Sequence, residues 1–232
     1  MTPDSTIVST PQTPDTSQQN RLGRHDAYVL LVLLGIIAAA LGIRWYYDNW
    51  IVDYDLLTQY MPWYGSVGEA VREFRVPAWN PSDSSGTPLA GSPASGWMNL
   101  ALMAVFAAFS VITAVKVYAL TLAIIAGVST YLLCRKLGLG APASLTGATA
   151  LAIGPMMYGS TMFGLWNSQV TAFIPLGVLA VEGAIRSPRV ANALGWSALA
   201  GLALSQMYLG SPPRFMYGAM YVFGWLAYRW LF

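Results

Sequence analysis

The residues of this chain whose types and positions could do chemistry are carboxylates. Asp48, Asp53 and Asp55 lie directly after the first hydrophobic segment, at the start of a polar and aromatic stretch over residues 53–99. Acidic side chains at a membrane boundary are costly to desolvate, so they tend to mark functional sites. The sequence therefore predicts that any active site lies in this stretch.

Thiol and imidazole chemistry are poorly supported by the composition. His25 is the single histidine and Cys134 is the single cysteine. These two residues disfavour a His/Cys metal cage or a Ser-His-Asp triad within this chain. The net charge of +2 is too small to indicate a nucleic-acid partner.

The remaining composition is that of a membrane protein. Hydrophobic residues make up 56% of the chain and charged residues 9%, against about 25% charged in a typical soluble domain. Several apolar runs of about 20 residues are long enough to cross a bilayer core of about 30 Å. We predict an all-α polytopic membrane protein with about six transmembrane helices.

The N-terminal region predicts the orientation. Residues 1–22 are rich in Thr, Ser, Pro and Gln and predict a disordered cytosolic tail. The first span, residues 27–43, follows Arg21 and Arg24, so the positive-inside tendency places the N-terminus in the cytoplasm. Residues 23–232 then form the transmembrane domain, in which 44–111 are an extracytoplasmic loop and a re-entrant segment.

A helical pattern lies inside that loop. Apolar residues recur at spacings of four, three, four and three residues, at Tyr60, Tyr64, Val67, Val71 and Phe74. The segment is too polar to span, so we predict an amphipathic helix over 59–75 that lies on the outer membrane surface. Its Arg72 and Arg75 could contact a substrate phosphate or lipid headgroups.

Charge decides how often residues 97–134 cross the membrane. A single crossing at 112–134 leaves Arg135 and Lys136 in the cytoplasm, and later Arg186 and Arg189 as well. We therefore predict a re-entrant or interfacial segment over 97–111. The other predicted spans are residues 143–162, 171–184, 191–209 and 215–232. Glu182 precedes Arg186 by four residues, which predicts an ion pair.

An ordered series of motifs resembles a known family. Asp55, Gln59, Tyr60 and Pro62 form an Asp-x-x-x-Gln-Tyr-x-Pro pattern, followed by Val-Pro-Ala-Trp-Asn-Pro at 76–81, Gly-Thr-Pro-Leu at 86–89 and Ser-Gly at 95–96. This succession, with Tyr-Leu-Leu-Cys-Arg-Lys-Leu-Gly-Leu at 131–139, is similar to the bacterial YfhO-like membrane proteins of the GT-C class of polytopic glycosyltransferases. The similarity runs from about residue 27 to the C-terminus.

The chain also departs from this family. Residues 210–213 read Gly-Ser-Pro-Pro where the family tends to carry Gly-His-Pro-Gln. Family members are longer, and this chain stops at Trp230-Leu231-Phe232 without a polar tail. We therefore expect it to be the N-terminal part of such a protein, incomplete at the C-terminus.

The resemblance implies transfer of a sugar from a polyprenyl-phosphate donor to an acceptor glycan, lipid or polymer outside the bacterial cytoplasmic (inner) membrane. The acceptor hydroxyl needs a base, and a partly desolvated carboxylate at the interface can serve. Asp55 heads the matching segment and is the predicted base, with Asp53 second, as metal ligand or acceptor orienter. The leaving lipid phosphate needs a cation, either Arg or Lys or a divalent cation such as Mg²⁺ or Mn²⁺. The predicted substrate-binding residues are Gln59, Tyr60, Arg72, Arg75, Trp79, Asn80 and Arg214.

Two other function classes stay open. In a transporter or flippase-like protein a span usually carries a central charge, which none does here, yet Gly154-Pro155 interrupts one span as transporters do. In a non-catalytic membrane scaffold, the outer loop would bind a partner. An Asp55→Asn variant separates the enzyme from both, because it stops transfer and leaves a scaffold nearly intact.

Overall fold

The computed structural model describes residues 23–47, 55–81, 83, 85–92, 94–158 and 165–232. Helices dominate these residues, which confirms the all-α prediction apart from two strands of two residues each. The elements are α1 (Arg24–Tyr47), η1 (Leu56–Tyr60), α2 (Met61–Arg72), β1 (Trp79–Asn80), β2 (Thr87–Pro88), α3 (Leu100–Ala108), α4 (Val111–Lys136), α5 (Ala141–Ala152), α6 (Pro155–Tyr158), α7 (Trp166–Ile185), α8 (Val190–Gly210) and α9 (Pro212–Leu231). The predicted tail, Asp48 and Asp53 lie outside the described residues.

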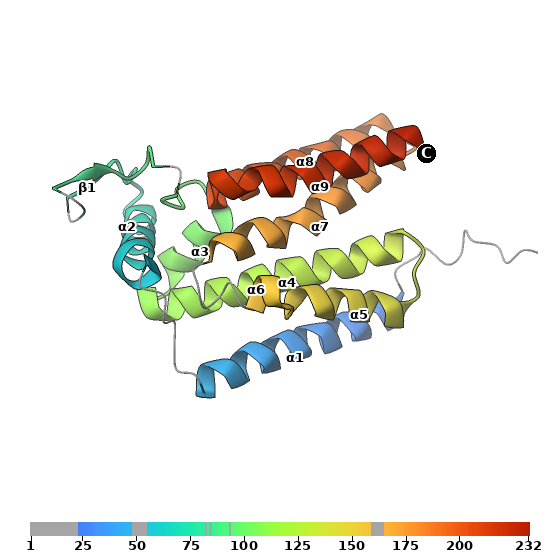
Figure 1. Ribbon diagram of the computed structural model, residues 1–232, viewed down its shortest axis with the longest axis horizontal. Coiled ribbons are helices and arrows are strands. Elements are labelled where there is room, and N and C mark those ends of the chain that lie inside the picture. Colours follow the sequence, from blue (N-terminus) through green and yellow to red (C-terminus); the bar gives the residue numbers. More distant parts are fainter. Residues whose placement is uncertain (1–22, 48–54, 82, 84, 93, 159–164) are drawn as a thin grey trace, which may run out of the picture.

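The long helices form a bundle with two different ends. In Figure 1, α1, α4, α5, α7, α8 and α9 run along one common direction, and successive helices reverse their sense. We call one end the hairpin end, where α2, α3, β1 and β2 lie. We call the other the basic end, because helix termini gather there that carry Arg24, Arg135, Lys136, Arg186, Arg189 and Arg229.

Three helices of the described residues are long and apolar enough to cross a membrane, judged by length and composition. They are Arg24–Tyr47, Val111–Lys136 and Asn167–Ile185. A helix satisfies its own backbone hydrogen bonds, which is what a hydrocarbon environment requires of a spanning segment. These helices support a membrane protein.

The predicted span at 143–162 is interrupted. Helix α5 has 12 residues, or about 18 Å at 1.5 Å per residue, and ends before Gly154. Helix α6 then restarts at Pro155. Proline disfavours helical backbone in the residue before it, which accounts for the break at this position. Residues 159–162 lie outside the described part of the chain.

Residues 97–134 contain one long helix, as the charge pattern predicted. Helix α3 has nine residues, which is about 14 Å and only half of a bilayer core. Asn99 caps it, accepting a hydrogen bond from the amide of Leu102 at 3.1 Å. Phe109 and Ser110 are extended and separate α3 from the 26-residue α4.

The predicted amphipathic helix is present, but its apolar face packs on protein. Tyr64 and Val67 are buried, and the Tyr64 ring lies 5.4 Å from the Phe106 ring of α3. Phe74 follows the end of the helix and is 99% exposed. The prediction that this stripe lies on the membrane surface is therefore wrong for Tyr64 and Val67. The spacing identified the buried face correctly, but a spacing does not say whether lipid or protein covers it.

Glycine sets how closely α2 approaches α3. A Cβ at Gly68 would collide with the backbone carbonyl of Phe106. A side chain at this position would push the two helices apart, since the colliding atoms belong to backbone. The docking of α2 therefore depends on this glycine.

Two ionic clusters join helices at the basic end. Asp26 of α1 is buried, and its Oδ1 accepts hydrogen bonds from the Tyr131 hydroxyl at 2.6 Å and from Arg135 Nε at 2.8 Å, both on α4. Glu182 of α7 is fully buried and pairs with Arg186, which confirms the predicted pair. Glu182 Oε2 also lies 3.2 Å from Arg229 Nε of α9.

Candidate functional site

The predicted base lies at the start of the hairpin-end segment. Asp55 directly precedes η1, has helical backbone angles (φ −64°, ψ −38°) and is exposed to solvent. Asp53, the second predicted acid and metal ligand, lies outside the described residues. Of the two predicted acids, the described part of the chain therefore presents Asp55.

The two predicted polar residues of η1 differ in their surroundings. Gln59 is exposed, whereas Tyr60 is half-buried. The Tyr60 ring lies 5.7 Å from the Trp63 ring and 5.8 Å from the Tyr64 ring. Aromatic contacts at these distances hold Tyr60 in one orientation. Of the two, Gln59 is the more open to a ligand.

The hairpin carries the predicted Trp-Asn pair. Trp79 pairs with Pro88 and Asn80 with Thr87 in antiparallel register. Trp79 is 59% exposed, while Asn80 is buried. Gly86, with φ +108°, lies against the indole, and a Cβ there would be 2.5 Å from Trp79 Cζ2. The structure therefore offers the indole of Trp79 to a ligand and keeps Asn80 in the hairpin interior.

Asp83 fastens this hairpin to α2, and the sequence reasoning did not single it out. Its Oδ2 accepts hydrogen bonds from Trp63 Nε1 at 3.0 Å and from the Thr87 hydroxyl at 3.4 Å. Its place in Pro-Ser-Asp-Ser-Ser-Gly is a turn signal. Nothing in that signal identifies Trp63, which lies 20 residues earlier, as its partner.

The predicted basic residues have protein partners. Arg72 Nη1 donates to the carbonyls of Phe106 and Ala107 at 3.1 and 3.3 Å, at the C-terminus of α3. Arg75 is exposed and pairs with Glu73 and, at 3.9 Å, with Glu69; the hydrogen bond to Glu73 raises the pKa of its guanidinium. Arg72 bonds to neutral carbonyls, so its charge stays available to an anion, whereas Arg75 is flanked by carboxylates.

Arg214 completes the predicted set. It lies in the first turn of α9 and is half-buried. Residues 210–213 directly precede Arg214 and contain the junction between α8 and α9 at the hairpin end. The fold therefore brings Asp55, Gln59, Trp79, Arg72 and Arg214 to one end of the bundle.

The sequence did not predict a buried polar cluster that lies beneath α2. We define the amide cluster as Tyr64 of α2, Asn99, Tyr118 of α4 and Gln169 of α7, all fully buried or nearly so. Gln169 Nε2 donates to the Tyr64 hydroxyl at 3.2 Å. Burial raises the pKa of the Tyr64 hydroxyl well above its usual range, against a smaller opposing effect of that hydrogen bond.

The amide cluster has unused hydrogen-bonding capacity. Among the described residues, Asn99 Nδ2, Tyr118 Oη and Gln169 Oε1 are buried without a hydrogen-bond partner. The Tyr118 hydroxyl nevertheless neighbours the side chains of both Gln169 and Asn99. Buried polar atoms are normally paired, so this cluster is an unusual part of the interior.

Backbone strain is concentrated in the same region. Phe74, Ser85 and Met98 have φ angles of 53°, 69° and 67°, and they are the non-glycine residues with positive φ in the described chain. Such residues are uncommon outside glycine, and strained backbone tends to persist at functional sites. All three lie in the segment that holds the hairpin.

The described residues do not assemble a metal site. Within them, no group of three or more His, Cys, Asp or Glu side chains could hold a metal ion. Of the two predicted acids, only Asp55 lies in the described part of the chain. A single carboxylate is too small a ligand set for Mg²⁺ or Mn²⁺. The arrangement that can be described is an exposed carboxylate with an indole, an amide and cations near the same end of the bundle.

Comparison with known proteins identifies no relative of this chain. No protein-family model, no curated protein and no solved structure matches the chain.

Proposed function

We propose that this chain is a multi-pass protein of the bacterial cytoplasmic membrane, with about six spans and a cytoplasmic N-terminus. The support is the distribution of charge along the bundle. The basic end carries Arg24, Arg135, Lys136, Arg186, Arg189 and Arg229 with two buried carboxylates, whereas at the hairpin end Arg44, Arg72, Arg75, Lys116 and Arg214 are offset by four described carboxylates, Asp55, Glu69, Glu73 and Asp83. Basic residues favour the cytoplasmic side. Helices α8 and α9 have 21 and 20 residues, about 30 Å each, which suits a crossing. The hairpin end is then extracytoplasmic.

The proposed activity is glycosyl transfer from a polyprenyl-phosphate sugar to a glycan, lipid or polymer of the cell envelope. The observation that carries it is the gathering of Asp55, Trp79 and Arg72 at the hairpin end, where a lipid-linked donor would present its sugar. Asp55 and Trp79 also lie in the motifs that resemble those of polytopic glycosyltransferases, and Arg72 lies in the helix between these motifs. The activity is proposed for the full-length protein.

In the proposed reaction, Asp55 acts as the general base. Its carboxylate takes the proton of the acceptor hydroxyl as the acceptor oxygen forms a bond to the anomeric carbon. The bond between that carbon and the phosphate oxygen breaks, and the lipid phosphate leaves with the electron pair. Arg72 and Arg214 stabilise the leaving phosphate by charge-assisted hydrogen bonds. Trp79 and Gln59 contact the sugar.

The decisive experiment replaces Asp55. General-base catalysis contributes about 10²- to 10⁴-fold, so Asp55→Asn in the complete protein should lower the transfer rate at least about a hundredfold. Glu69→Gln, an exposed carboxylate in the same segment, is the matched control and should retain wild-type transfer. Near-normal transfer by Asp55→Asn would remove Asp55 from the mechanism.

The orientation has a separate test. In a Cys134→Ser background, a Ser85→Cys probe at the hairpin end should react with an impermeant thiol reagent added outside intact cells. An Asn192→Cys probe in the first turn of α8, at the basic end, should react only after the membrane is opened. Both replaced residues are exposed. Reversed labelling would place the proposed site in the cytoplasm and exclude an extracytoplasmic reaction.

A transporter or flippase-like function is the second candidate, and the interruption between α5 and α6 favours it. Discontinuous helices form the substrate sites of many transporters. A transporter would keep its activity in Asp55→Asn and lose it when Gly154 and Pro155 are both replaced by alanine. The glycosyltransferase predicts the opposite ranking for these two variants. A scaffold would show neither activity.

A further inference from the structure

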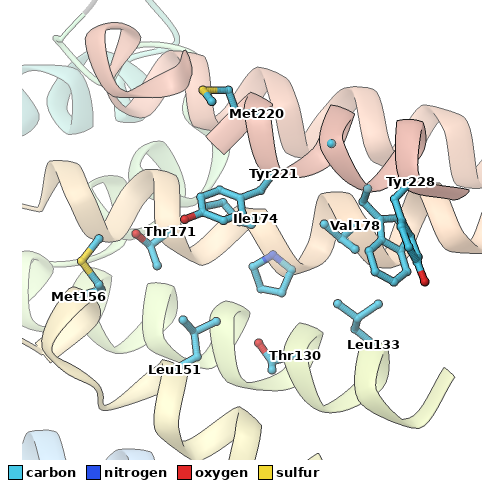
Figure 2. Close-up of a pocket in the computed structure, with 13 residues that line it drawn as sticks. Thr130, Leu133, Leu151, Met156, Thr171, Ile174, Val178, Met220, Tyr221 and Tyr228 are labelled. Carbon is cyan, nitrogen blue, oxygen red and sulfur yellow. The ribbon is translucent and has the colours of Figure 1, made fainter. Parts of the chain in front are cut away.

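An apolar groove runs along the inner part of α9. It has a volume of about 630 Å³ and lies between α4, α5, α6, α7 and α9. Figure 2 shows Met156 and Met220 toward one end of the groove and Leu133 and Tyr228 toward the other. On α9 the lining extends from Met220 to Tyr228, which is about 12 Å of helix.

The groove has an apolar lining and the size of a small-molecule site. The groove volume lies within the roughly 300–1,000 Å³ of small-molecule sites. An acyl chain that moves into the groove from surrounding lipid gains little from the transfer itself, because both surroundings are apolar, so lipid selectivity must come from the headgroup.

Cations surround the end of the groove that lies toward the basic end. Trp225 lines the groove and donates its Nε1–H to Glu182 Oε2 at 3.1 Å. Glu182 is the carboxylate that pairs with Arg186 and Arg229, whose side chains remain 39% and 30% exposed. Lys136, one turn beyond the groove residue Leu133, lies 4.4 Å from the centre of the Trp196 ring. Two arginines therefore pair with one carboxylate and Lys136 adds a third cation nearby, so this mouth carries excess positive charge.

We propose that the groove and this basic mouth form a binding site for an anionic phospholipid. One acyl chain occupies the groove, and the headgroup phosphate meets Arg229, Arg186 and Lys136. We infer an anionic phospholipid because its charge complements the basic mouth. Basic pockets between transmembrane helices on the cytoplasmic side attract anionic headgroups. The inference rests on the proposed membrane orientation and is independent of glycosyl transfer.

The first experiment fills the groove. Gly224 lines it, and a Cβ at Gly224 meets no atom within 4 Å, so Gly224→Leu adds a side chain without a clash inside the protein. Gly195→Leu on α8 is the matched control, because Gly195 also has no atom within 4 Å and is not part of the groove. The full chain is reconstituted with equal amounts of phosphatidylglycerol and phosphatidylcholine, and retained lipid is counted by native mass spectrometry. Wild type and Gly195→Leu should retain phosphatidylglycerol, and Gly224→Leu should lose it.

The second experiment tests the charge. Arg229→Gln should lower the ratio of retained phosphatidylglycerol to phosphatidylcholine about fivefold, which corresponds to about 1 kcal/mol per basic residue near an anionic lipid. Arg189→Gln removes an exposed cation at the same end and should leave the ratio unchanged. Equal retention of the two lipids by the wild type, lipid retention by Gly224→Leu, or no retained lipid on the wild type would each overturn the proposal. None of these outcomes bears on the Asp55 assay.

Discussion

The two ends of the bundle join helices through buried polar groups, but with different chemistry. At the basic end, Asp26 and Glu182 are buried carboxylates, and each contacts arginine from another turn or helix. At the hairpin end, the amide cluster is neutral, and among the described residues its side chains make one hydrogen bond with each other, from Gln169 to Tyr64. Ion pairs join the helices at the basic end, whereas the packing of side chains mainly joins them at the hairpin end.

The two ends therefore differ in how much free energy it costs to break their buried polar contacts. A buried ion pair is strongly destabilising to break, because the remaining charge stays without compensation. A neutral cluster with unpartnered atoms can exchange partners at smaller cost. The end that carries the candidate site is thus the end whose polar interior is less tightly fixed.

The largest expected effect comes from breaking the ionic anchor. Glu182→Ala leaves Arg186, Arg229 and the indole N–H of Trp225 without their carboxylate. The free energy of unfolding should fall by about 1.5–3 kcal/mol, the range for lost hydrogen bonds to a charged group, because Arg186 and Arg229 remain 39% and 30% exposed and can be hydrated. Denaturant titration in detergent micelles measures it. Glu69→Ala removes an exposed carboxylate and is the control. A loss below about 1 kcal/mol would mean that charge does not anchor the basic end.

A smaller effect is expected from the closest contact at the hairpin end. Gly68→Ala places a methyl group against the carbonyl of Phe106, which is backbone and cannot swing away. Overpacking of this kind destabilises by about 1–3 kcal/mol. Limited proteolysis should then cut within 73–99 sooner while the bundle stays intact. Gly201→Ala on α8, where a Cβ meets no atom within 4 Å, should leave cleavage unchanged and raise the free energy of unfolding by up to about 1 kcal/mol, because alanine has the higher helix propensity.

Local patterns predicted the helices and the nearest pairs. The spacing of Tyr64 and Val67 identified the buried face of α2, and the separation of Glu182 from Arg186 identified an ion pair. Length and charge together predicted a single long helix in 97–134. Each of these depends on residues within one or two turns, where periodicity carries the information.

The contacts that hold the candidate site were not accessible in this way. Tyr64 and Gln169, which meet beneath α2, are 105 residues apart. At the basic end, Asp26 and Tyr131 are separated by the same distance in sequence. No spacing rule connects such residues, since their meeting depends on how whole helices pack. The same limitation explains why α2 was placed on the membrane, because its pattern shows an apolar face and not what covers it.

The bond inside the amide cluster should be worth less than either preceding change. Gln169→Leu and Tyr64→Phe each remove one partner of the 3.2 Å hydrogen bond. Each should lower the free energy of unfolding by about 0.5–1.5 kcal/mol. The double variant should lose less than the sum, because no buried partner is then left unpaired. Strict additivity would show that the two side chains do not interact.

The smallest effect should come from Tyr118→Phe, and it distinguishes an unbonded Tyr118 hydroxyl from a hydrogen-bonded one. The Tyr118 hydroxyl is buried and has no hydrogen-bond partner among the described protein atoms. Deleting it breaks no hydrogen bond to another described protein atom and removes an unpaired buried polar group, so the free energy of unfolding should not fall by more than about 0.5 kcal/mol. Tyr131→Phe is the control at the basic end, where the hydroxyl donates to Asp26 at 2.6 Å, and it should be clearly destabilising. If Tyr118→Phe were as destabilising as Tyr131→Phe, the Tyr118 hydroxyl would be hydrogen-bonded to Asn99 and Gln169, either directly or through a buried water. The neutral end would then be as fully bonded as the ionic one, and the contrast between the two ends would be one of charge alone.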